Sequence, residues 1–352
     1  MEKTAKPSLQ STIRSAHDLI EAGLASESDR THLETVAQHY ATAVPPAFQA
    51  LIEDPNDPIG KQVIPTANEL ITQNYEMNDP IGDEAFSPLP GLIHRYEDRV
   101  LLKPLLICPL YCRFCFRREH VGPDGGLLSK NDLTKAFEWI DSHPEIQEVI
   151  LSGGDPLMLS PRRLSFIISH LSSITHIHTI RIHTRVPVAA PELINHELLQ
   201  ALDSEKAVWM VLHINHAQEL GPSAKAAIKS LVKEGIPLLS QSVLLRGIND
   251  NLDSLETLLR SLIQLRIKPY YLHHLDPAPG TSHFHVPVEK GLALLKALRG
   301  RVSGLAWPHY VVDIPGGKGK VPLGPSYLLP KENSYNGEEK IYSFRGDIHN
   351  FR

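Results

Sequence analysis

Residues 106–119, Leu-Ile-Cys-Pro-Leu-Tyr-Cys-Arg-Phe-Cys-Phe-Arg-Arg-Glu, decide which fold the rest of the chain is expected to form. They contain Cys108, Cys112 and Cys115, the only cysteines among 352 residues, in the spacing C-x3-C-x2-C. The apolar run 100–107 leading into them is typical of a buried strand. Three thiolates at a strand end can bind three irons of a [4Fe–4S] cluster. The fourth iron can then bind something other than the protein, whereas an electron-transfer ferredoxin normally supplies a fourth cysteine.

Other roles for these cysteines compete with the cluster. A structural zinc ion takes four ligands, and His120 is close enough in sequence to complete a Cys3His site. A disulfide framework is disfavoured because the number of cysteines is odd and residues 1–4 show no signal-peptide pattern. Scattered core cysteines are disfavoured because chance rarely places a chain's only three within eight positions.

Composition excludes several classes of protein. The net charge is −5, from 35 basic and 40 acidic residues, so no global basic field indicates a nucleic-acid partner. No apolar run approaches the roughly 18 residues of a membrane span. Unpaired cysteines without an export signal indicate a reducing compartment, and we expect a cytoplasmic protein.

The chain divides into three expected regions: residues 1–89, helical over 8–43 and irregular over 45–88; residues 90–309, in which strands and helices alternate; and residues 310–352. Six units of about 30 residues predict a parallel sheet wrapped by helices, an α/β fold. The predicted strands are 100–107, 147–152, 177–183, 207–213, 237–244 and 269–275. The predicted helices are 128–142, 160–172, 191–203, 217–234, 251–266 and 287–299. A last apolar run at 310–313 precedes a glycine-rich turn, and we expect the polar tail from 331 to close over the sheet edge.

Polar side chains follow each predicted strand. The cysteines follow the first strand, and residues 152–156, 183–185, 213–216, 246–250 and 274–276 follow the next five. Active sites of barrel enzymes are built at the carboxyl ends of the strands, so we expect these residues to meet there.

The segment 108–118, Cys-Pro-Leu-Tyr-Cys-Arg-Phe-Cys-Phe-Arg-Arg, resembles the lysine 2,3-aminomutase family of the radical S-adenosylmethionine (SAM) superfamily. This family also includes the enzymes that make β-lysine for elongation factor P. The resemblance extends from about residue 90 to about residue 323. It implies an open, partial (βα)6 barrel with an N-terminal helical subdomain and a C-terminal loop whose lysine binds pyridoxal phosphate (PLP). It also implies that SAM binds the open iron and that one electron from an external donor cleaves it to a deoxyadenosyl radical.

The resemblance implies which residues contact the cofactors. Alone, a Gly-Gly-Asp turn is common, but here it follows the cysteine-bearing strand by one unit and matches the turn that contacts SAM. In the loop 315–320, Pro-Gly-Gly-Lys-Gly-Lys, the match places the PLP lysine at Lys320, although Lys318 replaces a family glycine and leaves both lysines open. A Walker A motif is excluded by spacing. The implied cofactor contacts are Ser152, Gly153, Gly154, Asp155, Arg185 and Gln241 for SAM and its surroundings, and Arg95, Tyr96, Arg99 and Lys320 for PLP.

The implied substrate contacts are Arg117 for an α-carboxylate and the pair Asp276 and Asp313 for the distal ammonium of lysine. The charges of this pair suit a lysine substrate. A carboxylate about 4 Å from an ammonium contributes an attraction of up to about 4 kcal/mol at an intermediate dielectric constant, before the cost of desolvation is subtracted. Arg113 and Arg118 are expected to set the charge around the cluster. We interpret the alternating His283 and His285 as solvated or core residues, since no acidic or cysteine ligands are adjacent.

These observations predict a radical SAM, PLP-dependent isomerase that interconverts L-lysine and β-lysine. The same chemistry could supply β-lysine for elongation factor P. A radical SAM enzyme without PLP that modifies protein or RNA, and a non-catalytic iron–sulfur or zinc module, are the competing classes. Related bacterial aminomutases hold an intersubunit zinc with further cysteines, which this sequence lacks; a homo-oligomer stays open.

Overall fold

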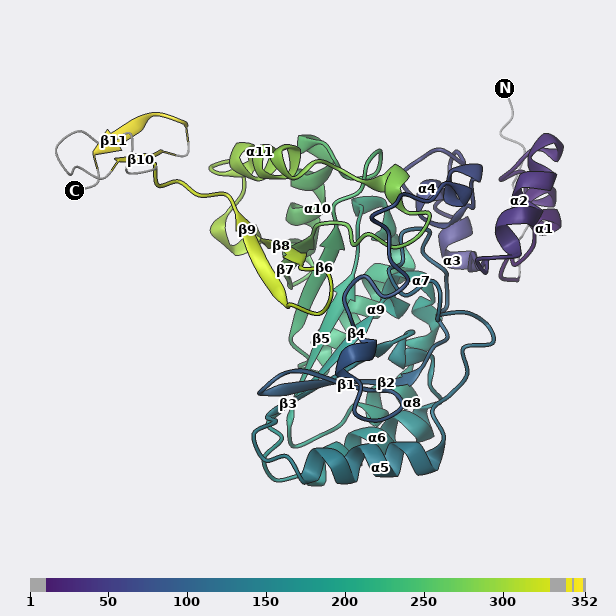
Figure 1. Cartoon of the computed structure of the whole chain (residues 1–352), viewed down its shortest axis with the longest axis vertical. Coiled ribbons are helices and arrows are strands. Elements are labelled where there is room, and N and C mark those ends of the chain that lie inside the picture. Colours follow the sequence, from purple (N-terminus) through teal and green to yellow (C-terminus); the bar gives the residue numbers. More distant parts are fainter. Residues whose placement is uncertain (1–10, 330–339, 344, 351–352) are drawn as a thin grey trace.

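The computed structural model describes residues 11–329, 340–343 and 345–350, and its main element is a nine-stranded sheet (Figure 1). The strands lie in the sheet in the order of the sequence. They are β1 Leu92–Tyr96, β2 Arg99–Leu105, β3 Glu148–Gly153, β4 Thr179–Thr184, β5 Ala207–His213, β6 Leu238–Val243, β7 Ile267–His273, β8 His309–Asp313 and β9 Lys320–Gly324. A separate hairpin pairs β10 Lys340–Tyr342 with β11 Ile348–Asn350.

The sheet is an open barrel. Neighbours from β2 to β8 are parallel, whereas β1 and β9 are antiparallel additions at the two ends of the strand order. Within the described residues β1 and β9 do not pair with each other. The predicted partial barrel is therefore confirmed. Neither end strand was predicted, and Lys320 is the first residue of β9 rather than part of a flexible loop.

The six crossover helices form where the sequence periodicity predicts them: α5 Lys130–Asp141, α6 Pro161–Ser173, α8 His196–Ala201, α9 Pro222–Lys233, α10 Leu252–Gln264 and α11 Val288–Leu298. A short extra helix, α7 Val186–Ala189, follows β4. The predicted helix 191–203 is shorter than expected, because the side chain of Asn195 accepts from the Leu198 N–H and starts α8 there. The predicted helix 217–234 begins as the 3-10 helix η6 Ala217–Glu219, before α9.

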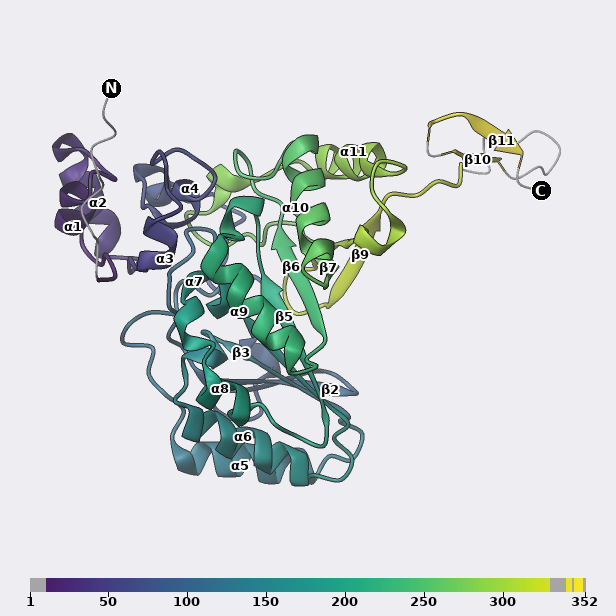
Figure 2. The ribbon, with the colours of Figure 1, turned by 180° about the vertical axis from the view of Figure 1, so that it is seen from behind.

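The core lies between the sheet and these helices, which cover its outer face in Figure 2. Four helices bury residues at i, i+3, i+4 and i+7, the pattern of one apolar helix face, α5 among them with Leu133, Ala136, Phe137 and Ile140. In the other three helices these residues are Leu164, Ile167, Ile168 and Leu171 of α6, Ala224, Ala227, Ile228 and Leu231 of α9, and Leu255, Leu258, Leu259 and Leu262 of α10. Each buried leucine or isoleucine contributes about 1.5–3 kcal/mol. Strands alternate accordingly: in β4, Ile180 and Ile182 are buried, while Arg181 and His183 line the opposite face.

The N-terminal segment consists of short helices joined by irregular backbone. They are α1 Ala16–Glu21, η1 Glu27–Asp29, α2 Arg30–Ala37, α3 Pro46–Gln49, α4 Gly60–Val63, η2 Ala67–Leu70 and η3 Glu84–Phe86. The helical region predicted over 8–43 starts outside the described residues, and its described part contains only α1, η1 and α2. Among the described helices, none has the length and apolar character needed to cross a membrane.

The C-terminal hairpin corrects one expectation. The polar tail was expected to close over the sheet edge, but Figure 1 shows β10 and β11 projecting away from the large sheet. Residues 330–339, 344 and 351–352 of this tail lie outside the described residues. The described part of the tail therefore does not cover the site.

Candidate active site

A cavity of about 690 Å³ lies on the inner face of the open barrel and at the carboxyl ends of its strands. Its lining combines part of the N-terminal segment and the loop after β2 with residues of β1 to β8 and the first residue of β9. The residues implied as cofactor and substrate contacts all line this one cavity: Arg95, Tyr96, Arg99, Cys108, Cys112, Cys115, Arg117, Ser152, Gly153, Gly154, Asp155, Arg185, Gln241, Asp276, Asp313 and Lys320. Other residues expected there from their place after a strand, 214–216, 246–250 and His274, do not line it. Residues more than 200 positions apart in sequence are thus brought together.

The three cysteines suit a cluster of several irons. Burial, the largest effect, raises the pKa of Cys108 well above its usual value and that of Cys115 to about 11, so without a cation these thiols stay protonated. Within the described residues no three Cys, His, Asp or Glu side chains converge on a single metal position. A cubane does not require such convergence, because each cysteine binds a different iron. His120, the fourth ligand considered for zinc, is exposed and faces Glu84 at 3.9 Å.

The glycine turn after β3 packs directly on the backbone that leads into the cysteines. The N–H of Gly154 donates to the Leu105 carbonyl at 2.9 Å, and that of Asp155 donates to the Ile107 carbonyl at 2.9 Å. A Cβ atom at Gly154 would lie 2.4 Å from the Ile107 oxygen, and Gly153 has a φ of +103°. Only glycine fits this approach without displacing the loop. The turn and the cysteine loop therefore form one structural unit.

Asp155 lines the cavity but uses its carboxylate within the protein. Its oxygens accept from the Thr184 hydroxyl at 2.7 Å and from the N–H groups of Arg185 at 2.6 Å and Val186 at 3.1 Å. Burial raises its pKa, although these hydrogen bonds oppose the shift. The side chain thus fixes the end of β4 against the glycine turn. Of the Ser152–Asp155 turn, this leaves the backbone and Ser152 to contact a ligand.

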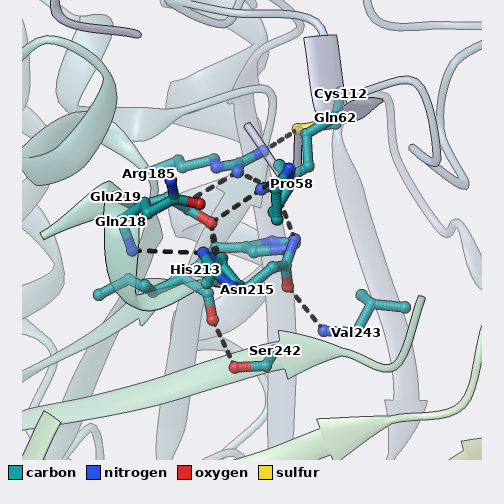
Figure 3. A network of polar contacts seen from close by, with 12 residues as sticks. Pro58, Gln62, Cys112, Arg185, His213, Asn215, Gln218, Glu219, Ser242 and Val243 are labelled. Atoms are coloured by element: carbon teal, nitrogen blue, oxygen red, sulfur yellow. Dashed lines mark hydrogen bonds and ion pairs between the residues drawn. The ribbon is translucent and has the colours of Figure 1, made fainter. Parts of the chain in front are cut away.

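Arg185 joins the cysteine loop to the N-terminal segment, as Figure 3 shows. Its guanidinium donates to Cys112 Sγ at 2.8 Å, to Gln62 Oε1 at 2.5 Å and to Glu219 Oε2 at 3.0 Å. Burial disfavours its charge, but Cys112 and Glu219 raise the pKa of the guanidinium above its ordinary value. The buried Asn215 donates from Nδ2 to the same Gln62 oxygen at 3.0 Å. Arg185 therefore lies beside the thiol of Cys112, a predicted iron ligand, and its guanidinium is held in place by the acceptors Gln62 and Glu219.

A second buried ion group holds the arginines inside the cysteine loop. Arg113 donates from Nη2 to Glu69 Oε2 at 2.6 Å, and Arg118 donates to the same oxygen. The Glu69 side chain is fully buried. Burial would raise its pKa, but Arg113 and Arg118 lower it below the usual value. The two arginines were expected to set the charge around the cluster. The structure instead pairs both with one carboxylate of η2, which offsets one of their two positive charges.

A third group connects the two predicted anion-binding arginines. Asp83 accepts from Arg95 Nη2 at 2.9 Å through one oxygen and from Arg117 Nη2 at 2.9 Å through the other. Burial would raise the pKa of Asp83, but Arg117 lowers it below its usual range. Arg99 lies over the Tyr96 ring at 3.9 Å. The predicted carboxylate and phosphate contacts therefore share one wall of the cavity.

Lys320 is placed between several polar groups. Its Nζ donates to the Asp313 carboxylate and lies 3.3 Å from His273 Nδ1, while its backbone N–H donates to the Tyr96 hydroxyl at 2.9 Å. Lys318 is exposed and does not line the cavity. The geometry thus favours Lys320 over Lys318 as the reacting lysine.

Asp276 and Asp313 form an acidic pair on the same wall. Burial raises the pKa of Asp276 to about 7, and the neighbouring charge of Asp313 adds to this shift. Burial would also raise the pKa of Asp313, but His273 and Lys320 hold it well below its usual range. Asp276 Oδ1 is buried without a hydrogen-bond partner among the described residues. This end of the cavity already holds one ammonium, that of Lys320, and has an unused carboxylate oxygen.

Sequence reasoning missed His273 and three acceptors from the N-terminal segment, Gln62, Glu69 and Asp83. One signal was available for the acceptors. Three arginines lie within residues 113–118, and buried guanidinium groups require carboxylate or amide partners. The sequence does not show which acidic residues these partners are.

Two segments of the chain match known families, and its similarity to characterised relatives extends over most of its length. Residues 102–261 match the Radical SAM superfamily, and residues 295–343 match the family described as Lysine-2,3-aminomutase. The L-lysine 2,3-aminomutase of Fusobacterium nucleatum is 39% identical over 91% of this chain and 76% of that protein. That of Clostridium subterminale is 41% identical over 83% of this chain and 70% of its own. The glutamate 2,3-aminomutase of Clostridioides difficile is 35% identical over 88% and 74%, respectively.

Proposed function

The chain belongs to the lysine 2,3-aminomutase family of the radical SAM superfamily, and we propose that it interconverts L-lysine and β-lysine. Because one relative carries the name of a glutamate 2,3-aminomutase, the proposal depends on the part of the cavity that meets the substrate side chain. The observation that carries it is the acidic pair Asp276 and Asp313 beside the ammonium of Lys320. The use of β-lysine for elongation factor P stays a prediction.

The family uses a [4Fe–4S] cluster, SAM and PLP, and the cavity offers residues suited to each. Cys108, Cys112 and Cys115 would bind the cluster, with SAM beside the glycine turn. Lys320 would bind PLP, with arginines suited to its phosphate at Arg95 and Arg99. When bound, these cofactors supply a carbon radical and a π system through which nitrogen can move between adjacent carbons.

The protein's own side chains would fix the substrate at both ends. Arg117 has a planar guanidinium suited to an α-carboxylate, and Asp83 fixes its orientation through Nε at 3.1 Å and Nη2 at 2.9 Å. Asp276 and Asp313 would hold the distal ammonium. With both ends bound, the carbons between them face the cysteine loop in a defined orientation. Such positioning is a large part of the rate acceleration by enzymes.

The same carboxylates disfavour glutamate. A substrate carboxylate about 4 Å from one ionised aspartate would be repelled by about 4 kcal/mol at an effective dielectric constant of 20. The side-chain ammonium of lysine meets attraction of the same order. The preference for lysine therefore follows from the sign of the charge at this end of the cavity.

The test is anaerobic reconstitution with iron and sulfide, followed by addition of dithionite, SAM and PLP to parallel samples of lysine and glutamate. Dithionite replaces the external electron donor. We expect β-lysine from lysine and unchanged glutamate, by chromatography of the derivatised amino acids. Unchanged lysine together with isomerised glutamate would contradict the substrate assignment. Turnover of lysine without added PLP, in protein that shows no PLP absorbance, would contradict the cofactor assignment.

A further inference from the structure

His273 is the last residue of β7 and lies beside the proposed reacting lysine. Its Nδ1 is 3.3 Å from Lys320 Nζ and 3.8 Å from Asp313 Oδ2. The ring lines the cavity, and its Nε2 is buried without a hydrogen-bond partner among the described residues. Three residues from three adjacent strands, β7, β8 and β9, thus meet at one nitrogen atom. The proposed function gives Lys320 and Asp313 a role but assigns none to His273.

The chemistry of Lys320 requires a proton acceptor. A lysine ammonium has no lone pair, so it must lose a proton before its nitrogen can bond to a carbonyl carbon. One of the Nζ hydrogens is directed at the Asp313 carboxylate, so Asp313 is one neighbouring group that could accept the proton. Asp313 itself accepts protons poorly, because His273 and Lys320 hold its pKa well below the usual range despite burial. The imidazole is the other acceptor in contact with Nζ.

We propose that His273 is a catalytic base: its Nδ1 takes a proton from Nζ of Lys320 before that nitrogen bonds to PLP. The N–H bond at Nζ breaks and leaves its electron pair on nitrogen, while a new N–H bond forms at Nδ1. The positive charge moves from lysine to imidazole, where Asp313 stabilises it. In the reverse direction His273 returns the proton when Lys320 is displaced. The inference rests on the proposed function, since it takes Lys320 as the lysine that binds PLP.

The surroundings of His273 favour the neutral form of the imidazole, which is the form that can accept a proton. Titratable groups face it from five strands: Lys320 on β9, Asp313 on β8, Tyr271 on β7, His213 on β5 and His183 on β4. Burial and the charge of Lys320 lower the pKa of His273, against the opposing effect of Asp313. A neutral ring accepts at Nδ1 when its own proton is on Nε2.

The adjacent histidine provides a matched control. His274 Nδ1 lies 2.9 Å from the Tyr310 hydroxyl, and its ring does not line the cavity. His274→Gln therefore changes the same residue type one position away without touching Lys320. His273→Gln keeps a polar side chain of similar length but removes the basic nitrogen.

The experiment follows attachment of PLP to the full chain, with its cluster reconstituted and with no SAM or substrate. PLP is mixed with wild type, His273→Gln and His274→Gln, and the absorbance change is recorded between pH 6 and pH 9. Borohydride then traps the product, and mass spectrometry identifies the modified lysine. We expect attachment about 100-fold slower in His273→Gln, the order of a lost general base. We also expect a steeper rise of its rate with pH, and wild-type behaviour in His274→Gln.

A second variant keeps the test decisive if His273→Gln folds poorly. His273→Ala leaves space for added imidazole, which we expect to restore the attachment rate at least tenfold. Attachment to Lys320 at the wild-type rate and with the wild-type pH profile in His273→Gln would overturn the inference, as would a lack of imidazole rescue in folded His273→Ala. If borohydride traps no PLP on Lys320 in wild type, the proposed function fails instead, so the two failures are distinguishable.

Discussion

Lysine binding is expected to weaken about tenfold from pH 8 to pH 6, because Asp276 must be ionised to pair with the substrate ammonium. Burial, and the neighbouring Asp313, raise the pKa of Asp276 to about 7. A carboxyl group with that pKa is about 90% ionised at pH 8 and about 10% ionised at pH 6. Its charge is therefore present above pH 7 and is lost as the pH falls through the raised pKa.

Other groups near the substrate keep their charge over this range. Burial lowers the pKa of His183 and His213 well below its ordinary value, so these two rings stay neutral from pH 6 to pH 8, and burial also lowers the pKa of His273. The pKa of Asp313 is held low by His273 and Lys320 against burial, so Asp313 stays ionised. A PLP phosphate titrates near pH 6, and this contribution is common to wild type and variant.

The measurement is the dissociation constant of lysine by calorimetry at pH 6, 7 and 8, with PLP and SAM present and no reductant, so that no turnover occurs. Asp276→Asn should bind lysine at least tenfold more weakly than wild type at pH 8. It should also lose most of the tenfold dependence on pH. The exposed Asp203→Asn should behave as wild type. Equal pH dependence in wild type and Asp276→Asn would refute the reasoning.

Two further predictions concern the residues that hold the site together. Glu69→Gln leaves two buried arginines without their shared carboxylate. We therefore expect the free energy of unfolding, measured by urea denaturation at pH 7, to fall by about 3–5 kcal/mol. Glu138 is exposed, so Glu138→Gln should change the free energy of unfolding by less than about 0.5 kcal/mol. Equal effects of the two substitutions would contradict a stabilising role for the ion pairs of Glu69. Gly154→Ala places a Cβ 2.4 Å from the Ile107 oxygen, so we expect about 3 kcal/mol of destabilisation and reduced iron content after reconstitution. Gly122→Ala meets nothing within 4 Å and should retain its iron; retained iron and stability in Gly154→Ala would show that the turn does not hold the loop.

The barrel was predictable because its signals are local. Helix faces repeat at i, i+3, i+4 and i+7, and strands are short apolar runs ending in polar residues. The predicted strand 207–213 coincides with β5, and the other five differ from the structure by a few residues. The end strands β1 and β9 were not predicted. Both pair antiparallel to the barrel and lack a continuous apolar run: β1 has only Leu92 and Ile93 buried, and β9 has only half-buried or exposed residues.

The grouping of the site residues was predictable from topology, but their partners were not. Parallel strands bring their carboxyl ends to one edge, so the cysteines and Asp276 were expected to meet, and the family resemblance added Asp313 to them. Glu69 and Asp83 come from a segment without periodicity, and their pairing with arginines depends on long-range packing. His273 is the last residue of β7 and His274 follows it directly, yet the first contacts Lys320 and the second contacts Tyr310. Sequence could not show which of the two faces the cavity.

The N-terminal segment determines the charge of the cavity. Guanidinium groups buried beside the cysteine loop cost several kcal/mol each unless they are paired. Gln62, Glu69 and Asp83 supply acceptors for them, all from outside residues 102–261 that match the Radical SAM superfamily. Without the carboxylates of Glu69 and Asp83 this region would carry two more units of positive charge and would repel a substrate of net positive charge. With the arginines paired, the carboxylates of Asp276 and Asp313 can attract that substrate. The charge preference of this site therefore depends on the segment that precedes the barrel as well as on the two aspartates.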